Sequence, residues 1–162
     1  MIIIAIDPGF DRLGLAVIEK QKNSKERLLY SETFQTNKKD SFNTRLQQVV
    51  NRFIEKTREY DAQQLAIETL FFSTNRKTAM QVSEVRGALL FAAMQEGLEI
   101  FEYGPSQIKT AITGYGSADK HSMIMMVTKL IVMDDSEAKR HDDEYDAIAC
   151  GLTHCAINNV VE

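Results

Sequence analysis

Long apolar runs are absent from the sequence. No stretch approaches the ~20 consecutive apolar residues that a membrane-spanning helix needs, and the N-terminal run MIIIAI is short. No basic segment precedes that run and no cleavage site follows it, so we do not expect a signal peptide. These absences favour a protein without membrane contact.

Cysteine is scarce as well. The two cysteines, Cys150 and Cys155, are five residues apart in a segment that we expect to be helical, where this spacing does not favour a disulfide. No second Cys/His pair is present that would complete a zinc site. The sequence therefore predicts reduced cysteines and a cytoplasmic protein.

An excess of basic residues is also missing. The chain has 19 Lys and Arg against 23 Asp and Glu, which gives a formal net charge of -4. This balance argues against a protein that binds nucleic acid indiscriminately, but it is compatible with a local basic face.

What is present is the composition of one globular domain. The chain has 162 residues, of which 44% are hydrophobic and 26% are charged, close to globular averages. We find no internal repeat, linker or low-complexity segment. We therefore predict a single domain over residues 1–162, long enough for one continuous core.

The order of the expected elements indicates an α/β fold. Residues 1–7, 12–20 and 26–36 are typical of three strands joined by short turns, which favours an antiparallel meander. We expect further strands at 64–68 and 98–103, and helices within 40–60 (capped by Asp40 or Ser41), at 75–96, after Pro105, at 120–131 and at 142–159. Strands and helices in this order predict a mixed sheet flanked by helices.

Acidic residues stand where two of these strands end. Asp7 ends the first strand before a Pro-Gly turn, and Glu68 ends the strand 64–68. An aspartate before Pro-Gly also suits simple turn formation. If the two strands are neighbours, however, both carboxylates leave the sheet at one edge. Asp143 and Asp146 share one face of the last helix, because they are three residues apart, and the small apolar stretch that follows suits packing on the sheet.

Four converging carboxylates would raise each other's pKa values unless cations neutralise them. Hard oxygen ligands favour Mg²⁺ or Mn²⁺, and two such ions about 4 Å apart can promote phosphodiester cleavage. We therefore expect two ions per site. Asp142 competes with Asp143 as the third ligand, although helix capping is its simpler role. We expect Glu144 to point into solvent.

Four segments of the chain resemble a known family in order and spacing. They are IDPGFDRLGLAVIE, IETLFFSTNRKTAMQVSEVRG, FEYGPSQIKTAITGYGSADK and DDEYDAIACGLTHC. Together they resemble the RuvC Holliday junction resolvases over nearly the whole chain. The resemblance implies an RNase H-like fold, with a five-stranded mixed sheet whose first three strands are antiparallel. It also implies that Asp7, Glu68, Asp143 and Asp146 are the catalytic, metal-binding acids.

The substrate implied by the resemblance is a four-way DNA junction, cut by paired symmetric nicks. Lys109 and Lys120 fall where the family carries functional lysines, which would offset charge on the phosphate being cut. Which of the two lies nearer to that phosphate stays open.

Further residues are candidates for DNA binding. Phe71 corresponds to a phenylalanine that stacks on a base at the opened crossover. Phe72 is either a second exposed aromatic or part of the core beneath the loop. Arg76 and Lys77 are well placed to contact the DNA backbone.

Paired nicks suit a C2 homodimer. The helix expected at 75–96 is apolar on more than one face, and by resemblance it forms the subunit interface, although a fully buried helix would show the same pattern. Branch-migration motor proteins are further partners that the family suggests.

Three other functions are alternatives for this sequence. An endonuclease of phage or mobile-element type, acting broadly on branched DNA, would have the same acids. A junction-binding protein that does not cleave would lack one of them. An actin-like or Hsp70-like ATPase would need a second phosphate-binding turn and an adenosine site, for which 162 residues leave no room.

Overall fold

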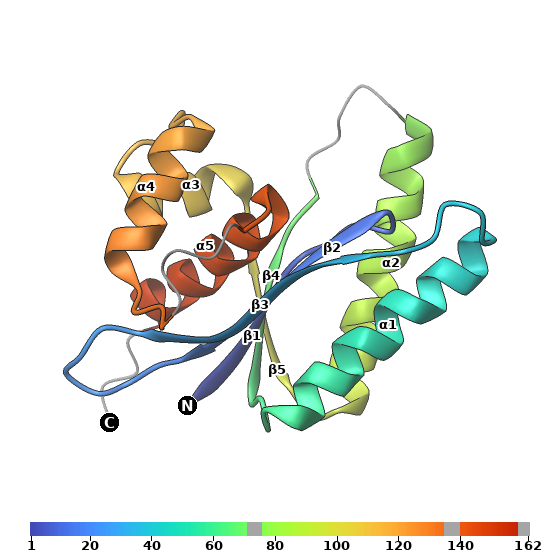
Figure 1. The fold of residues 1–162 in the computed structure, drawn as a ribbon, viewed down its shortest axis with the longest axis horizontal. Helices are drawn as coiled ribbons and strands as arrows, with labels where there is room; N and C mark the ends of the chain where they lie inside the picture. Colours follow the sequence, from blue (N-terminus) through green and yellow to red (C-terminus); the bar gives the residue numbers. More distant parts are fainter. Residues whose placement is uncertain (71–75, 135–139, 159–162) are drawn as a thin grey trace.

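The computed structural model describes residues 1–70, 76–134 and 140–158, with only the backbone for residues 76 and 77. The strands are β1 (Ile2–Asp7), β2 (Arg12–Glu19), β3 (Arg27–Gln35), β4 (Gln64–Glu68) and β5 (Glu99–Tyr103). The helices are α1 (Phe42–Glu59), α2 (Arg76–Gln95), α3 (Pro105–Thr113), α4 (Lys120–Leu130) and α5 (Asp142–Ile157). All the strands and helices expected from the sequence are present, and most of their ends agree to within one residue (Figure 1).

The five strands form one mixed sheet in the order β3-β2-β1-β4-β5. The pairs β1–β2 and β2–β3 are antiparallel, whereas β1–β4 and β4–β5 are parallel. The predicted antiparallel meander of the first three strands is therefore confirmed. Ile6 of β1 lies opposite Ile67 of β4, so the next residues, Asp7 and Glu68, emerge side by side at one edge of the sheet.

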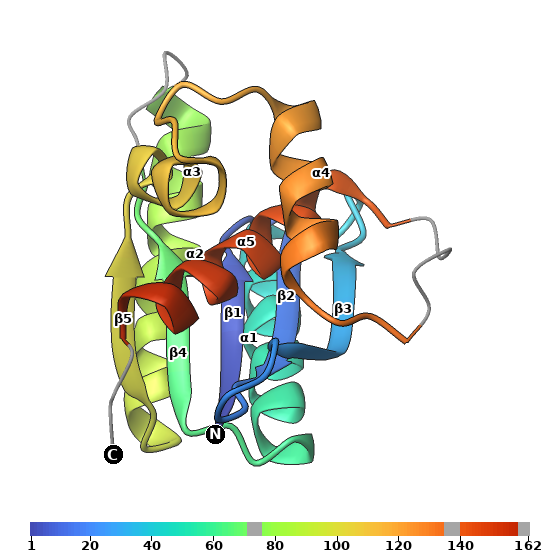
Figure 2. The ribbon, with the colours of Figure 1, turned by 90° about the vertical axis from the view of Figure 1, so that its left-hand side faces the viewer.

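The helices cover the sheet on both faces, with α1 and α2 on one face and α3, α4 and α5 on the other (Figures 1 and 2). Side chains alternate between faces along a strand. In β1, Ile3 packs into the core on the α5 face and Ile4 into the core on the opposite face. By the same alternation, Asp7 faces α5. Glu68 faces α5 too, because it lies two residues after Ala66, which packs into that core.

Helix α5 lies directly on β1 and β2, because small residues remove the side chains that would separate them. A Cβ on Gly151 would lie 2.6 Å from Cδ1 of Ile18 and 2.9 Å from Cβ of Ala5. A Cβ on Gly14 would lie 2.1 Å from the carbonyl oxygen of Asp143. This close approach fixes the start of α5 against β2 at Gly14, the residue that pairs with Asp7 of β1.

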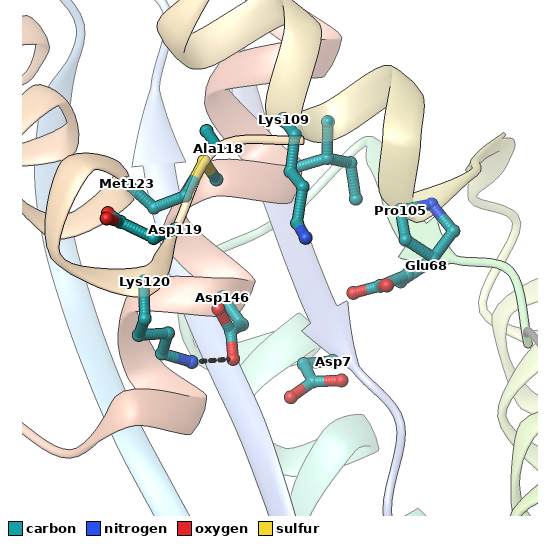
Figure 3. A pocket seen from close by; sticks show the side chains of 10 residues that line it. Asp7, Glu68, Pro105, Lys109, Ala118, Asp119, Lys120, Met123 and Asp146 are labelled. Carbon is teal, nitrogen blue, oxygen red and sulfur yellow. Dashed lines mark hydrogen bonds and ion pairs between the residues drawn. The ribbon is translucent and has the colours of Figure 1, made fainter. Parts of the chain in front are cut away.

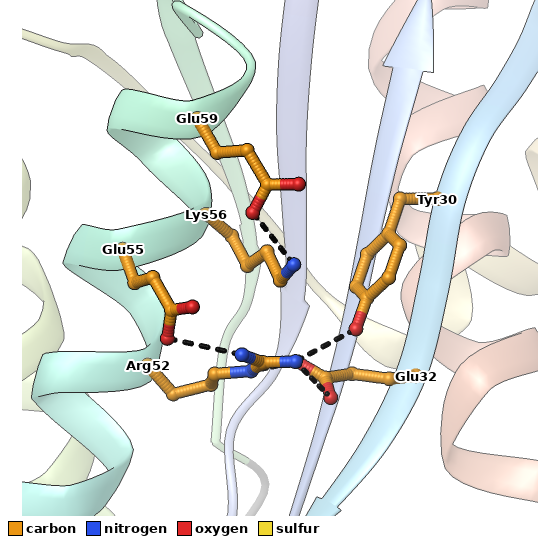
Figure 4. A network of polar contacts seen from close by, with 6 residues as sticks. All are labelled: Tyr30, Glu32, Arg52, Glu55, Lys56 and Glu59. Atoms are coloured by element: carbon orange, nitrogen blue, oxygen red, sulfur yellow. Dashed lines mark hydrogen bonds and ion pairs between the residues drawn. The ribbon is translucent and has the colours of Figure 1, made fainter.

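A polar network joins α1 to β3 on the opposite face (Figure 4). The guanidinium of Arg52 donates to both carboxylate oxygens of Glu32 and to the hydroxyl of Tyr30. The ammonium of Lys56 lies 4.2 Å from the centre of the Tyr30 ring, a cation–π contact. These contacts attach the outermost strand of the meander to its helix.

The cysteines are as the sequence predicts, since Cys150 and Cys155 are both buried in α5 and unpaired. Across the described ranges, no helix has the length and apolar character needed to cross a membrane.

Candidate active site

A hollow of about 380 Å³ opens at the edge of the sheet where β1 and β4 end (Figure 3). We call it the acidic hollow. Its lining residues are Asp7, Glu68, Pro105, Ile108, Lys109, Ala118, Asp119, Lys120, Met123 and Asp146. Three of the four predicted acids and both predicted lysines therefore meet here, although they come from five different elements.

Each of the five charged residues is held by regular structure. Asp7 and Glu68 are the last residues of their strands, and a strand end holds a ligand more rigidly than a loop does. Lys109 lies in the middle of α3 and directs its ammonium into the hollow (Figure 3). Lys120 is the first residue of α4, and Asp146 lies in the second turn of α5.

Burial and mutual repulsion raise the pKa values of the three acids. Burial is the largest cause for Asp7, followed by the charges of Glu68, Asp146 and Asp143, and its pKa rises to about 8. Burial and then the charge of Asp146 raise the pKa of Glu68 to about 7. The pKa of Asp146 is also raised, again mainly by burial. Acids in this situation need added positive charge to stay ionised at neutral pH.

Part of that charge comes from Lys120. Its ammonium donates a hydrogen bond of 2.5 Å to Oδ2 of Asp146, and this contact opposes the rise in the pKa of Asp146. The charges of Lys120 and Lys109 also lower the pKa of Glu68, against the larger effect of burial. Both lysines thus act on the acids electrostatically.

Asp143 lies beside the acidic hollow and is not among its lining residues. Its Oδ2 is 3.8 Å from Nη1 of Arg12, and this buried oxygen has no hydrogen-bond partner within the described ranges. The residue is nevertheless close enough to Asp7 to raise the pKa of that carboxyl. Its placement between the hollow and Arg12 is a feature that the sequence does not predict.

The neighbours of Asp143 differ from their expected roles. Asp142 is exposed and is the first helical residue, whereas the N-cap is His141. The expectation that Glu144 points into solvent is wrong, because Glu144 is only 8% exposed. Its carboxylate accepts hydrogen bonds from Oγ of Ser31 and from the backbone N–H of His141. It therefore ties the start of α5 to β3.

The donor set fits a hard cation, although the acids are not gathered around one point. No three Asp, Glu, His or Cys side chains in the described part of the chain lie close enough together to hold a metal ion as they stand. Asp146 is engaged by Lys120 and Asp143 faces Arg12. Carboxylate oxygens are the ligands that Mg²⁺ prefers, and the unpartnered Oδ2 of Asp143 is a buried acceptor without a donor.

Four predicted DNA-binding residues cannot be placed at this site. Phe71 and Phe72 lie outside the described residues, and the side chains of Arg76 and Lys77 are not described either. The backbone of Arg76 and Lys77 forms the first turn of α2. Their roles stay predictions.

Arg86 of α2 contacts the end of β4 from the face of the sheet opposite α5 (Figure 1). Its Nε donates to the backbone carbonyl of Glu68 at 3.2 Å, and its guanidinium forms an ion pair with Glu102 of β5. The side chain therefore fixes the end of β4. The sequence allows a structural, dimer or DNA-binding role for Arg86 but does not predict this partner, because no spacing pattern links a helix residue to a carbonyl 18 positions earlier.

The sequence of this chain is similar to those of known nucleases. The sequence model of the family described as crossover junction endodeoxyribonuclease RuvC matches residues 3–154. A protein of that name from Thermosipho melanesiensis is 41% identical over 149 residues, covering 92% of this chain and 93% of its own. Another, from Brachyspira hyodysenteriae, is 38% identical over 160 residues, covering 99% and 97%.

Solved structures extend the likeness to the fold. The structure of T. thermophilus RuvC in complex with Holliday junction substrate superposes with a TM-score of 0.88 at 32% identity, covering 97% of this chain and 94% of that one. The yeast mitochondrial Holliday junction resolvase Ydc2 has a TM-score of 0.68 at 9% identity, covering 95% and 76%. At that identity the second match supports the fold alone.

The sheet order and the site of acids at its edge define an endonuclease with an RNase H-like fold. More closely, the chain belongs to the RuvC family of crossover junction endodeoxyribonucleases. Membership of this family implies a metal-dependent nuclease.

Proposed function

We propose that this protein resolves four-way (Holliday) DNA junctions by paired symmetric nicks. The observation that carries the proposal is the acidic hollow, in which Asp7, Glu68 and Asp146 meet two lysines at the end of the sheet. The similarity of this chain to a RuvC whose structure was solved with a Holliday junction supports the choice of substrate. We infer that residues 1–162 act as a single domain, in the cytoplasm.

In this proposal, Asp7, Glu68, Asp143 and Asp146 are the ligands of two divalent cations, Mg²⁺ or alternatively Mn²⁺. Bound cations supply positive charge that activates a water and stabilises the leaving oxygen. Asp7 and Glu68 provide fixed oxygens from the strand ends. Asp146 would complete the set, and the ammonium of Lys120, which donates to its Oδ2, would then compete with a cation for that oxygen.

The lysines then face the DNA. Lys120, when freed from Asp146, and Lys109, which already points into the acidic hollow (Figure 3), would offset the negative charge that develops on the phosphate. Phe71 and Phe72 would stack on bases at the crossover, and Arg76 and Lys77 would contact the backbone. Of these four roles, only that of Phe71 is supported by family position; the other three are inferred from the place of the residues in the sequence.

Metal removal gives the direct test. Purified protein is incubated with a synthetic four-way junction in Mg²⁺, in Mn²⁺ and in EDTA, beside a linear duplex of the same sequence. We expect symmetric paired nicks in the junction only, and none in EDTA. Nicking of linear or otherwise branched DNA would instead indicate a broad nuclease, and binding without nicks would indicate a protein that does not cleave.

We further propose that α2 forms the interface of a homodimer. Met80, Phe91 and Met94 of this helix are 66%, 61% and 59% exposed, and Gly87 leaves open space on the same side. Residues at these spacings line one face of a helix. A second copy of α2 would cover that face, and a two-fold axis would present two active sites to a nearly symmetric junction.

Phe91→Glu should break this dimer, because it places a charge at the centre of the apolar face. We expect the mass in solution to fall from twice the 18.4 kDa chain to that of one chain, and paired nicks to give way to single, uncoupled nicks. Light scattering and a nicking gel measure the two effects. Met125→Glu, at an exposed position on α4, serves as the control and should leave both unchanged.

A further inference from the structure

A second hollow, of about 420 Å³, lies at the same end of the molecule as the acidic hollow. Its walls are the β1–β2 turn with Gly9 and Arg12, the end of β3 with Gln35, the following loop with Lys38, and the start of α2 with Val82. We call it the basic hollow. Asp7, Glu68, Asp143, Asp146, Lys109 and Lys120 are not among the described residues that line it.

The turn beside the basic hollow is braced by Arg45 of α1, whose side chain is 9% exposed. Its guanidinium forms an ion pair with Asp11 and donates to Oγ1 of Thr36 at 2.8 Å. Thr36 in turn donates to the carbonyl oxygen of Phe10 at 2.6 Å. The ring of Phe10 lies 4.8 Å beneath the guanidinium carbon. The walls are thus held in place by contacts made within this chain.

The bracing also decides the charge of the basic hollow. Asp11 is the acid among the lining residues, and Arg45 neutralises it through the ion pair. Among the described lining residues two cationic side chains remain, Lys38 and Arg12. Arg12 is 57% exposed and lies 3.8 Å from Asp143. In a chain of net charge -4, this site is locally positive, so it attracts anions more strongly than the protein as a whole.

The lining does not suit a small apolar ligand. Phe10 and Val82 are the large apolar side chains among the residues that line the basic hollow, and the others are polar, charged or glycine. Small-molecule sites are enclosed and mainly apolar, whereas a phosphate backbone is held by cations and amides on an open surface. Arg12, Lys38 and the side-chain amide of Gln35 are donors of that kind.

Arg12 connects the two hollows. The residue lines the basic hollow, and its Nη1 lies 3.8 Å from Oδ2 of Asp143 beside the acidic hollow. A DNA strand whose phosphate is cut at Asp7 would therefore present neighbouring phosphates to Arg12 and then to Lys38. We propose that the basic hollow binds the sugar-phosphate backbone of the junction DNA next to the cleavage position. This inference rests on the proposed function.

The first experiment compares Lys38→Ala with Lys39→Ala. Both lysines are exposed, both substitutions remove one positive charge, and Lys39 does not line the hollow. Junction affinity is measured by fluorescence anisotropy in EDTA over a range of salt concentrations. Loss of one phosphate contact lowers the salt slope by about 1. We expect Lys38→Ala to lower it by that amount and to raise Kd ~3–10-fold at moderate salt, with no change of slope for Lys39→Ala.

A second experiment tests proximity. Lys38→Cys and Lys39→Cys are labelled with a thiol-reactive photo-crosslinker, which the native Cys150 and Cys155 should not take up because both are buried. Irradiation with the junction should attach position 38 to the cleaved strand, within a few nucleotides of the nick. Position 39 should attach to it much less.

The results of these two experiments distinguish failure of this inference from failure of the proposed function. Equal salt slopes and equal crosslinks at positions 38 and 39, with wild-type protein that binds and cuts the junction, would overturn the inference and leave the proposed function intact. Crosslinks from position 38 to a second protein chain would also overturn it, since the hollow would then be a subunit contact. Wild-type protein that neither binds nor cuts the junction would overturn the proposed function itself.

Discussion

Asp7→Asn should abolish junction cleavage while the protein stays folded and binds the junction. The amide has nearly the shape of the carboxylate, but it carries no charge and is a weak ligand for Mg²⁺. Losing a central ligand removes several kcal/mol of charge stabilisation, and each 1.36 kcal/mol is tenfold in rate. We therefore expect the rate of nicking to fall about 10³-fold or more.

The stability of Asp7→Asn should equal or exceed that of the wild-type protein. Burial and the neighbouring acids raise the pKa of Asp7 from 3.8 to about 8. Between these two pH values, folding of the metal-free protein therefore requires Asp7 to take up a proton, at a cost in folding free energy. The neutral amide removes that cost. In EDTA, the variant should unfold at the wild-type Tm or above it, and it should bind the junction with at least the wild-type affinity, because the substitution adds no negative charge near the phosphates.

Asp61→Asn is the matched control. Asp61 is exposed in the turn before β4, at the end of that strand away from Glu68. Its φ of 50° is one that asparagine also adopts. The control should keep its cutting rate within about twofold, as surface substitutions usually have small effects. If Asp7→Asn is unfolded, or cuts as fast as the control, Asp7 is not the metal ligand that we propose.

The placement of Asp7 and Glu68 could be predicted because their signal is local. Each closes a short apolar run, and a buried run that ends in an acid predicts both the strand and the position of the carboxylate at its tip. The parallel pairing of β1 and β4 then brings the two tips together. The placement follows once the two strands are neighbours, and it does not depend on the details of side-chain packing.

The contacts around these acids could not be predicted in the same way. Glu144 is an example. Helix periodicity alone predicts that its side chain points away from the sheet, yet its carboxylate accepts a hydrogen bond from Ser31 of β3. The pairing of Arg45 with Asp11, and of Arg86 with the carbonyl of Glu68, likewise joins distant elements. An arginine on a helix has the same local sequence pattern whether it is solvated or buried, so only the tertiary structure reveals its partner.

Gly14→Ala should push α5 away from the sheet. Gly14 pairs with Asp7 in the β1–β2 ladder, and a Cβ there would lie 2.1 Å from the carbonyl oxygen of Asp143. A backbone atom cannot turn aside as the end of a long side chain can, so the start of α5 must shift. Overpacking costs ~1–3 kcal/mol or more, and this contact belongs at the upper end. A loss of ~3 kcal/mol lowers the Tm of a chain of this size by roughly 6–12 °C.

Cleavage should fall further than the loss of stability explains. Moving the start of α5 takes Asp143 and Asp146 away from Asp7, so the nicking rate should drop at least tenfold even at a temperature where circular dichroism shows the variant to be folded. Gly104→Ala is the control, because among the described residues a methyl group there meets only Oγ1 of Thr69, at 3.7 Å. It replaces a helix N-cap residue, which costs about 1 kcal/mol or less. Wild-type Tm and wild-type cutting by Gly14→Ala would mean that α5 does not hold its acids against β2 in the way described.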